Sequence, residues 1–164
     1  MKKKHISISL LLLIILMIMI FCFSAQPGDE SELTSSGFSL MATKIIFKKY
    51  TAYTPEVQKI ILDGITHVVR KLAHFTEYAF MGFLWYLFLR NKKGNILLSV
   101  MATACYAASD ELHQKFVEGR SAQVSDVILD TCGGCFGVVV AFVLLCIICC
   151  CTNKEIVRFG VWKE

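Results

Sequence analysis

Charged residues are scarce in this chain of 164 residues: Asp, Glu, Lys and Arg together make up 18% of it, whereas hydrophobic residues make up 55%. An ordinary soluble domain carries about 25% charged residues. The mean hydropathy of +0.60 is also too high for a soluble domain of this length. Internal repeats and low-complexity tracts are missing, which argues against a repeat array. These properties together indicate a membrane protein.

The cysteines lack the companions that a metal site would need. The chain has eight cysteines, and Cys132 and Cys135 have the spacing of a redox or zinc motif. Cys146 and Cys149 repeat this spacing, but they follow Cys135 by 11 residues, about 16 Å along a helix, which is too far for both pairs to share one tetrahedral zinc ion. No histidine pair stands nearby. We therefore expect no metal and no cofactor, and we expect the cysteines to pack as small apolar side chains.

Four apolar stretches approach the ~20 residues that a membrane-spanning helix needs. They predict an all-α fold, an integral membrane bundle of four transmembrane helices over residues 6–23, 71–90, 95–112 and 124–151. The first stretch could also be read as a signal peptide. Its apolar run is longer than a typical signal core and its candidate cleavage sites are poor, so we expect an uncleaved anchor.

Basic residues on alternate connections predict the orientation of this bundle. They occur in the N-terminal segment 1–5, between the second and third stretches, and in the tail 152–164. Acidic residues follow the first stretch. Both termini are therefore predicted to be cytoplasmic, with the lipid bilayer as the main partner. The net charge of +4 reflects this anchoring and does not argue for binding to nucleic acid.

The extracytoplasmic segment 24–70 has two predicted parts. Residues 24–39 are rich in serine, glycine and acidic residues and predict a loop. Thr54 can then cap a helix that has Pro55 in its first turn. Apolar residues recur there at three- and four-residue steps: Val57, Ile60, Ile61, Ile65, Val68 and Leu72. This stripe predicts an amphipathic helix that either lies on the outer leaflet or packs on the protein's own helices.

Polar side chains stand at the extracytoplasmic ends of the last three spans and in the loop 113–123. Charge close to hydrocarbon is costly and is rarely present without a partner or a task. The positions that we expect to share one ligand-binding site are Lys71, His74, Glu77, Tyr78, Asp110, Glu111, His113, Gln114, Arg120, Asp126 and Asp130. Helical spacing places neighbours in this set on common faces. Gly133 and Gly137 continue the line of the two aspartates and predict a face for close helix packing.

Two interpretations of this polar set stay open. The charges can form an ion-pair network that fixes helix register, or they can bind a polar ligand. The catalytic candidates are His74, Glu77 and Asp110, with His74 or Glu77 as general base and Arg120 holding an anionic group. No serine or cysteine is plainly paired with a base, so the sequence leans against an enzyme.

The same residues resemble the pattern of the VanZ-like family of bacterial membrane proteins. The resemblance rests on Lys71-x-x-His74-Phe75-x-Glu77-Tyr78, on Asp110-Glu111-x-His113-Gln114-x-Phe116-Val117-x-Gly119-Arg120, and on Asp126 with Gly133 and Gly137. Phe23-Ser24-x-Gln26-Pro27 also looks like the family, so the resemblance covers residues 21–137. Glu118 and Asp130 depart from the usual pattern, which has proline and asparagine at those positions.

The resemblance implies a place in the bacterial cell membrane and a role in the cell envelope. The founding member is associated with low-level resistance to the glycopeptide teicoplanin, and the family has no settled catalytic mechanism to transfer. We therefore expect an outward-facing polar site that lowers susceptibility to lipophilic glycopeptides. A lipid-linked cell-wall precursor or a glycopeptide is the expected ligand. The alternatives are a membrane enzyme that acts on such a precursor, and a small transporter or proton relay.

Overall fold

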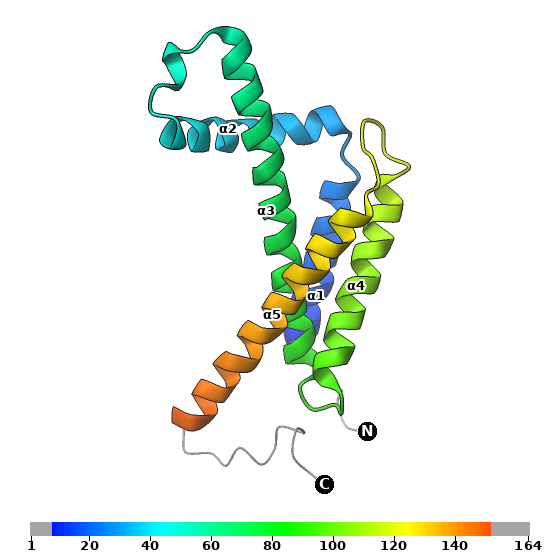
Figure 1. Ribbon diagram of the computed structural model, residues 1–164. Coiled ribbons are helices and arrows are strands. Elements are labelled where there is room, and N and C mark those ends of the chain that lie inside the picture. Colours follow the sequence, from blue (N-terminus) through cyan, green and yellow to red (C-terminus); the bar gives the residue numbers. More distant parts are fainter. Residues whose placement is uncertain (1–7, 152–164) are drawn as a thin grey trace.

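The computed structural model describes residues 8–151 and shows an all-α protein, as predicted (Figure 1). Its helices are α1 (Ile8–Ser24), α2 (Gly28–Ile46), the short 3-10 helix η1 (Tyr50–Ala52), α3 (Pro55–Leu89), α4 (Asn95–Gln114) and α5 (Val124–Cys151). Figure 1 shows α1, α3, α4 and α5 as a bundle whose successive helices alternate in direction, with α2 lying across its upper end. The basic segments 1–5 and 152–164 lie outside the described residues.

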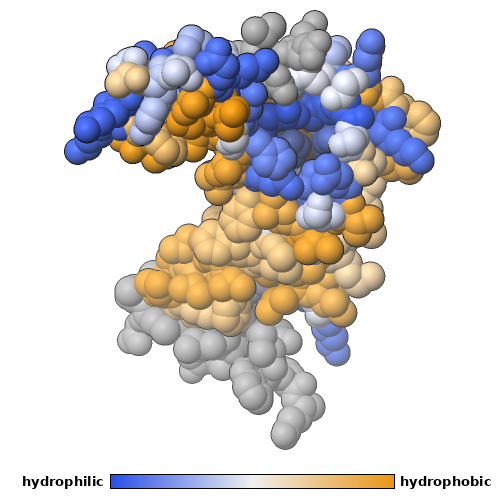
Figure 2. Space-filling model, turned by 45° about the horizontal axis from the view of Figure 1, so that its top comes forward, coloured by the Kyte–Doolittle hydropathy of each residue, from blue (hydrophilic) through white to orange (hydrophobic). Residues whose placement is uncertain are grey.

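One helix within residues 8–151 is long and apolar enough to cross a membrane. It is α5, over Val124–Cys149, and α1 is a shorter apolar helix. The predicted spans correspond to α1, the second half of α3, α4 and α5, and a crossing by all four stays a prediction. Figure 2 shows hydrophobic residues over the visible trunk of the molecule and hydrophilic residues gathered at the end where α2 lies.

The predicted loop over residues 24–39 is wrong, because α2 begins at Gly28 and runs without a break to Ile46. Its serine and glycine residues are weak helix formers, but tertiary contacts override such preferences. α2 contacts α3, and the side chains of Ser39 and Thr43 are fully buried. The Thr43 hydroxyl donates a hydrogen bond to the Ser39 carbonyl at 2.8 Å, which satisfies one buried polar group inside the helix.

The predicted amphipathic helix and the second span are one continuous helix, α3, of 35 residues. At 1.5 Å per residue it measures about 52 Å, well beyond the ~30 Å of a bilayer's hydrocarbon core. Thr54 stands at the N-cap position before Pro55 as predicted, but its side chain makes no capping hydrogen bond. Ile60 and Leu72 of the apolar stripe stay 72% and 59% exposed, so packing on the protein's own helices does not cover the stripe.

α5 crosses α3 at backbone contact. A Cβ atom added to Gly133 or Gly137 would overlap carbonyl oxygens of α3, and Gly82 of α3 faces the backbone of Gly134 in the same way. Such close approach is possible only where both helices present small residues. The two glycines predicted for helix packing therefore lie at the crossing.

Apolar side chains on both sides of this crossing form the core. The buried members of its two clusters are Leu13, Ile20, Tyr78, Met81 and Ala107 in one, and Tyr86, Val138 and Ala141 in the other. The Tyr106 hydroxyl donates to the Met17 carbonyl at 2.6 Å, which ties α4 to the middle of α1.

Candidate functional site: two cavities at the polar end

The predicted polar residues gather at the end of the bundle that carries α2. A cavity of about 190 Å³ opens there, and we call it the polar cavity. α3 contributes His67, Arg70, Lys71 and His74, and α4 contributes Glu111 and Gln114. The loop after α4 contributes Gly119, Arg120, Ser121 and Gln123, and α5 contributes Asp126, Leu129 and Asp130. Three helices and one loop thus converge on a single charged hollow.

A second cavity of about 210 Å³ lies between the end of α1, the start of α2 and the same part of α3. We call it the side cavity, and its lining is Phe23, Gln26, Ser31, Ser35, Val69, Arg70, Ala73, His74, Glu77 and Arg120. Arg70, His74 and Arg120 line both cavities. These three side chains therefore form a shared wall between the two hollows.

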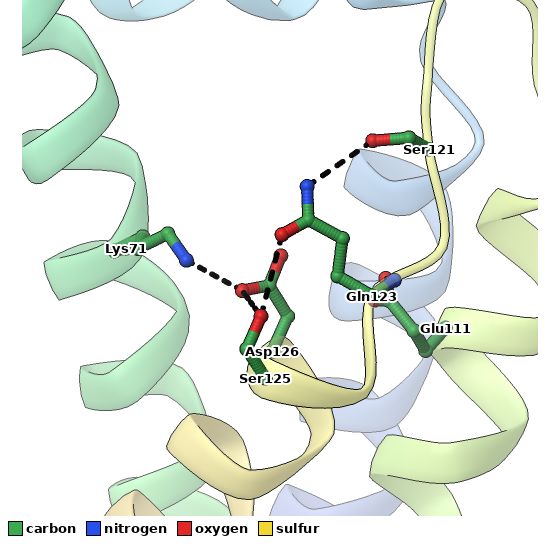
Figure 3. A network of polar contacts seen from close by, with 6 residues as sticks. All are labelled: Lys71, Glu111, Ser121, Gln123, Ser125 and Asp126. Atoms are coloured by element: carbon green, nitrogen blue, oxygen red, sulfur yellow. Dashed lines mark hydrogen bonds and ion pairs between the residues drawn. The ribbon is translucent and has the colours of Figure 1, made fainter.

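Lys71 and Asp126 form an ion pair across the polar cavity (Figure 3). The Lys71 Nζ atom donates to Asp126 Oδ1 at 2.6 Å, and the two side chains are 33% and 30% exposed. Figure 3 shows Lys71 reaching from α3 toward the first turn of α5. The pair joins two helices whose residues are far apart in the sequence.

Glu111 fixes the loop that leads into α5. The Gln123 backbone N–H donates to Glu111 Oε1 at 2.6 Å, and Glu111 is 6% exposed. The Gln123 side chain donates to the Ser121 hydroxyl at 3.3 Å and accepts from the Ser125 hydroxyl at 3.3 Å. Glu111 thus holds the wall of the polar cavity in place.

Asp110 holds the end of α4 against the end of α1. The Ser24 hydroxyl donates to Asp110 Oδ2 at 2.8 Å, and the Gln114 amide donates to the same oxygen at 3.2 Å and to the Ser24 hydroxyl at 3.0 Å. Asp110 is 4% exposed. Its Oδ1 atom and the Tyr78 hydroxyl have no hydrogen-bond partner among the described residues. Neither Asp110 nor Tyr78 lines the polar cavity or the side cavity, and their role in a site stays a prediction.

Arg120 binds neutral backbone oxygens and not a carboxylate. Its Nε atom donates to the Gln26 carbonyl at 3.0 Å, and Nη2 donates to the Phe23 carbonyl at 3.1 Å. Asp126, which the sequence analysis placed in the same site, pairs with Lys71. Burial, followed by the positive charge of Arg70, lowers the pKa of the Arg120 guanidinium. An arginine nevertheless stays protonated in proteins, so a half-buried positive charge stands in the shared wall.

The loop that carries Arg120 is also held at its backbone. The Gly28 N–H donates to the Glu118 carbonyl at 3.0 Å, and the backbones of Gly28 and Gly119 are in contact. Gly119 has a φ of 72°, a left-handed conformation that favours glycine. Glu118 contributes through its carbonyl, which any residue provides, so its departure from the family's proline leaves this contact intact.

The other predicted site residues line one cavity, both cavities or neither. Asp130, 3% exposed, borders the polar cavity, and Glu77 lines the side cavity only. The Nδ1 atom of His74 is buried without a hydrogen-bond partner among the described residues. The His113 ring stacks on the Phe21 ring with centroids 4.6 Å apart, and His113 lines neither cavity.

The site includes residues that the sequence analysis did not place in it. Ser24 and Gln26 at the end of α1, and His67 and Arg70 on α3, belong to its walls or its supports. Two signals were available. Arg70 directly precedes Lys71, and Ser24 and Gln26 follow the first apolar stretch at the end that the other polar residues share.

The described residues contain no group of three or more His, Cys, Asp or Glu side chains that could hold a metal ion. In a comparison with known protein families, a model described as VanZ/LLP1 matches residues 9–146, which is most of the chain. Comparisons with curated proteins and with solved structures find no match. The matched segment contains all of the motif residues and both cavities.

Proposed function

The chain belongs to the VanZ/LLP1 family, and from this premise we propose that it is a multi-pass protein of the bacterial cell membrane with both cavities on the outer face. The family match confirms the resemblance that the motifs predict. One apolar helix, α5, accords with membrane association.

The arrangement of the bundle supports this orientation. In Figure 1, α1 begins and α5 ends at the end that carries the turn between α3 and α4. The polar cavity lies at the opposite end, where α4 ends and α5 begins. Arg90, Lys92 and Lys93 of that turn are exposed. Lys and Arg are concentrated in the cytoplasmic connections of membrane proteins. The polar end then faces outward.

α2 supports the same placement, because it carries an exposed apolar face next to basic residues. Phe38, Met41 and Ile45 recur at three- and four-residue steps and are 62%, 57% and 67% exposed. Lys44 and Lys48 are exposed beside them. Such a helix suits the boundary between hydrocarbon and headgroups. We therefore place α2 at this interface, which the sequence analysis offered as one of two positions for the start of α3.

We infer that the protein lowers susceptibility to lipophilic glycopeptides such as teicoplanin, and the polar cavity is the observation that carries this inference. Arg70, Lys71 and Arg120 line it together with Glu111, Asp126 and Asp130. Lys71 pairs with Asp126, whereas the hydrogen bonds of Arg120 go to backbone carbonyls, so Arg120 is the cation that suits an anionic part of an envelope component. In the proposed orientation the cavity lies where cell-wall precursors and lipophilic antibiotics meet. No catalysis is required for this role.

A single substitution tests this function. A deletion strain is complemented with the wild-type gene, with His74→Gln, or with His113→Gln as the matched control, because His113 lines neither cavity. Glutamine keeps hydrogen bonding but does not titrate. We expect His74→Gln to restore membrane abundance by immunoblot but not teicoplanin resistance, and His113→Gln to restore both. Joint loss of abundance and resistance in His74→Gln indicates a structural role, and full resistance excludes His74 from the function.

An enzyme remains a second candidate, because His74 and Glu77 both line the side cavity. An enzyme would change the lipid or precursor composition of the membrane. Lipid extracts from the wild-type, deletion and His74→Ala strains decide this. A species altered in the same way in both mutants supports catalysis, and identical extracts with an altered susceptibility support binding alone.

The transporter alternative has no comparable support. Charged residues are absent from 78–89 of α3, from 95–109 of α4 and from 131–151 of α5. A proton or ion relay needs charged groups through the hydrocarbon region. The described spans concentrate their charged residues at one end.

A further inference from the structure

Arg120 is a half-buried cation whose known partners are all neutral. Its two hydrogen bonds go to the backbone carbonyls of Phe23 and Gln26, and it makes no ion pair within the described part of the chain. A guanidinium carries five N–H donors, and these two hydrogen bonds use only two of them. A desolvated positive charge of this kind is stabilised most by an anion that accepts from it.

His74 provides a second group in the same wall. Its Nδ1 atom is buried and has no hydrogen-bond partner among the described residues, although buried polar atoms are nearly always bonded. Both His74 and Arg120 border the two cavities. An anion bound between them is therefore accessible from the polar cavity on one side and from the side cavity on the other.

The two cavities differ in chemistry on the two sides of this wall. Lys71 and Asp126 line only the polar cavity, whereas Phe23, Val69 and Ala73 line only the side cavity. The side cavity also has polar residues at its border: Gln26, Ser31, Ser35 and Glu77. Phe23 is 45% exposed at the end of the apolar helix α1. An apolar chain in the side cavity therefore continues along the surface of α1. The pair of cavities suits a molecule with a charged head and a chain.

The cavity sizes limit what can bind. The two volumes are about 190 and 210 Å³, whereas pockets for drug-sized ligands span about 300–1,000 Å³. A whole glycopeptide antibiotic is larger than a typical drug and does not fit inside. A headgroup and the first part of one chain do fit.

We propose that this site binds a single-chain phosphate ester of the outer leaflet, with the phosphate between Arg120 and His74 and the start of the chain in the side cavity. This inference rests on the proposed outward-facing site and names its ligand class. A phosphate monoester offers three acceptor oxygens, and arginine binds phosphate through two parallel N–H donors. A carboxylate offers fewer acceptors to the groups in the shared wall.

Binding of model amphiphiles to the purified full chain tests the proposal. Native mass spectrometry from nonionic detergent micelles compares dodecyl phosphate with dodecanol, dodecanoate and inorganic phosphate. We expect dodecyl phosphate to bind at least tenfold more tightly than each of the other three. Equal binding of dodecanol removes the anion site, equal binding of dodecanoate removes the preference for phosphate, and equal binding of inorganic phosphate removes the chain site.

Two variants test the site for the phosphate and the site for the alkyl chain separately. Arg120→Gln should weaken dodecyl phosphate binding about ten- to hundredfold, the range for a lost hydrogen bond to a charged group. Arg90→Gln removes the same charge at the opposite end and should change nothing. Ala73→Leu fills the side cavity and should weaken dodecyl phosphate at least tenfold while inorganic phosphate binds as before. Ala108→Leu, at an exposed position on α4, is its control.

Ala73→Leu keeps the test valid if Arg120→Gln fails to fold, because Ala73 has no side-chain polar contact to lose. Unchanged dodecyl phosphate binding in folded Arg120→Gln or in Ala73→Leu overturns the proposal. Failure of the ligand proposal can be distinguished from failure of the proposed function. If His74→Gln loses teicoplanin resistance while dodecyl phosphate binds no better than dodecanol, the proposed function stands and the phosphate ester is the wrong ligand.

Discussion

The side chains at the polar end have two different roles. Asp110 and Glu111 direct their bonds to the protein itself, Asp110 to Ser24 and Gln114 and Glu111 to the backbone of Gln123. Both are nearly fully buried. Glu111 also lines the polar cavity, together with Lys71, His74 and Arg120. The two carboxylates hold the walls in place, and the nitrogen-bearing side chains determine what the walls attract.

The Lys71–Asp126 pair should show a small coupling free energy. Both side chains are about one-third exposed, so solvent screening limits the interaction to about 1 kcal/mol. Lys71→Met and Asp126→Asn together should cost about 1 kcal/mol less than the sum of the single changes. Unfolding of the purified variants in mixed micelles measures all four states. Arg120→Gln combined with Asp126→Asn is the control and should be additive, since the two side chains make no direct bond.

Sequence reasoning singled out most of the charged residues that line the two cavities, but it missed Arg70 and the acceptors of Arg120. Charged side chains near apolar stretches are visible in a sequence because their burial is costly. The carbonyls of Phe23 and Gln26 carry no such signal, because every residue has one. A cation held by backbone oxygens can therefore be located only in the folded chain.

Among the helices, the crossing of α3 and α5 depends on glycine. Gly137→Ala places a methyl group into the carbonyl oxygen of Ala79, so the helices must move apart. Such overpacking should lower the free energy of unfolding by roughly 1–3 kcal/mol. Gly64→Ala, on an exposed part of α3 with no atom near the added group, should raise it by about 1 kcal/mol, because alanine is the better helix former.

Thermal unfolding of both glycine variants in one detergent measures these opposite effects. A Gly137→Ala protein as stable as the wild type would mean that the helices do not meet at this crossing. A loss of stability in Gly64→Ala would point to a contact that the structure does not contain.

The helices differ in how well their sequences indicate them. α1 and the part of α5 from Thr131 onward are continuous apolar runs, and this pattern indicates both helices in the sequence. α2 has no such pattern, since its sequence begins with glycine, serine and acidic residues, and its contacts with α3 compensate for weak local preference. The continuity of α3 through Arg70 was also not predictable, because a helix that leaves the membrane and one that turns along its surface have the same local sequence.

The polar end of the molecule should lie on the outer face of the membrane. Reporter fusions or cysteine labels at Gly37 and Gly119 should report outside, and those at Asn91 and Lys154 should report inside, because basic residues flank the second pair. Gly64 adds a test of the length of α3. It should also report outside, since α3 is longer than a bilayer core is thick. An outside signal at Asn91 contradicts the topology and the outward-facing site with it.

The contacts that close the polar end also set the order in which the protein can be assembled as it is made. Ser24 and Asp110 are 86 positions apart, and Arg120 is 94 and 97 positions from its acceptors in Gln26 and Phe23. In the proposed topology α1 enters the membrane while α4 and its loop are still unsynthesised, and inserted helices associate only afterwards. The end of α1 can therefore form these contacts only after the chain has been synthesised as far as Arg120. A nascent chain halted before Arg120 keeps its anchor but has neither cavity.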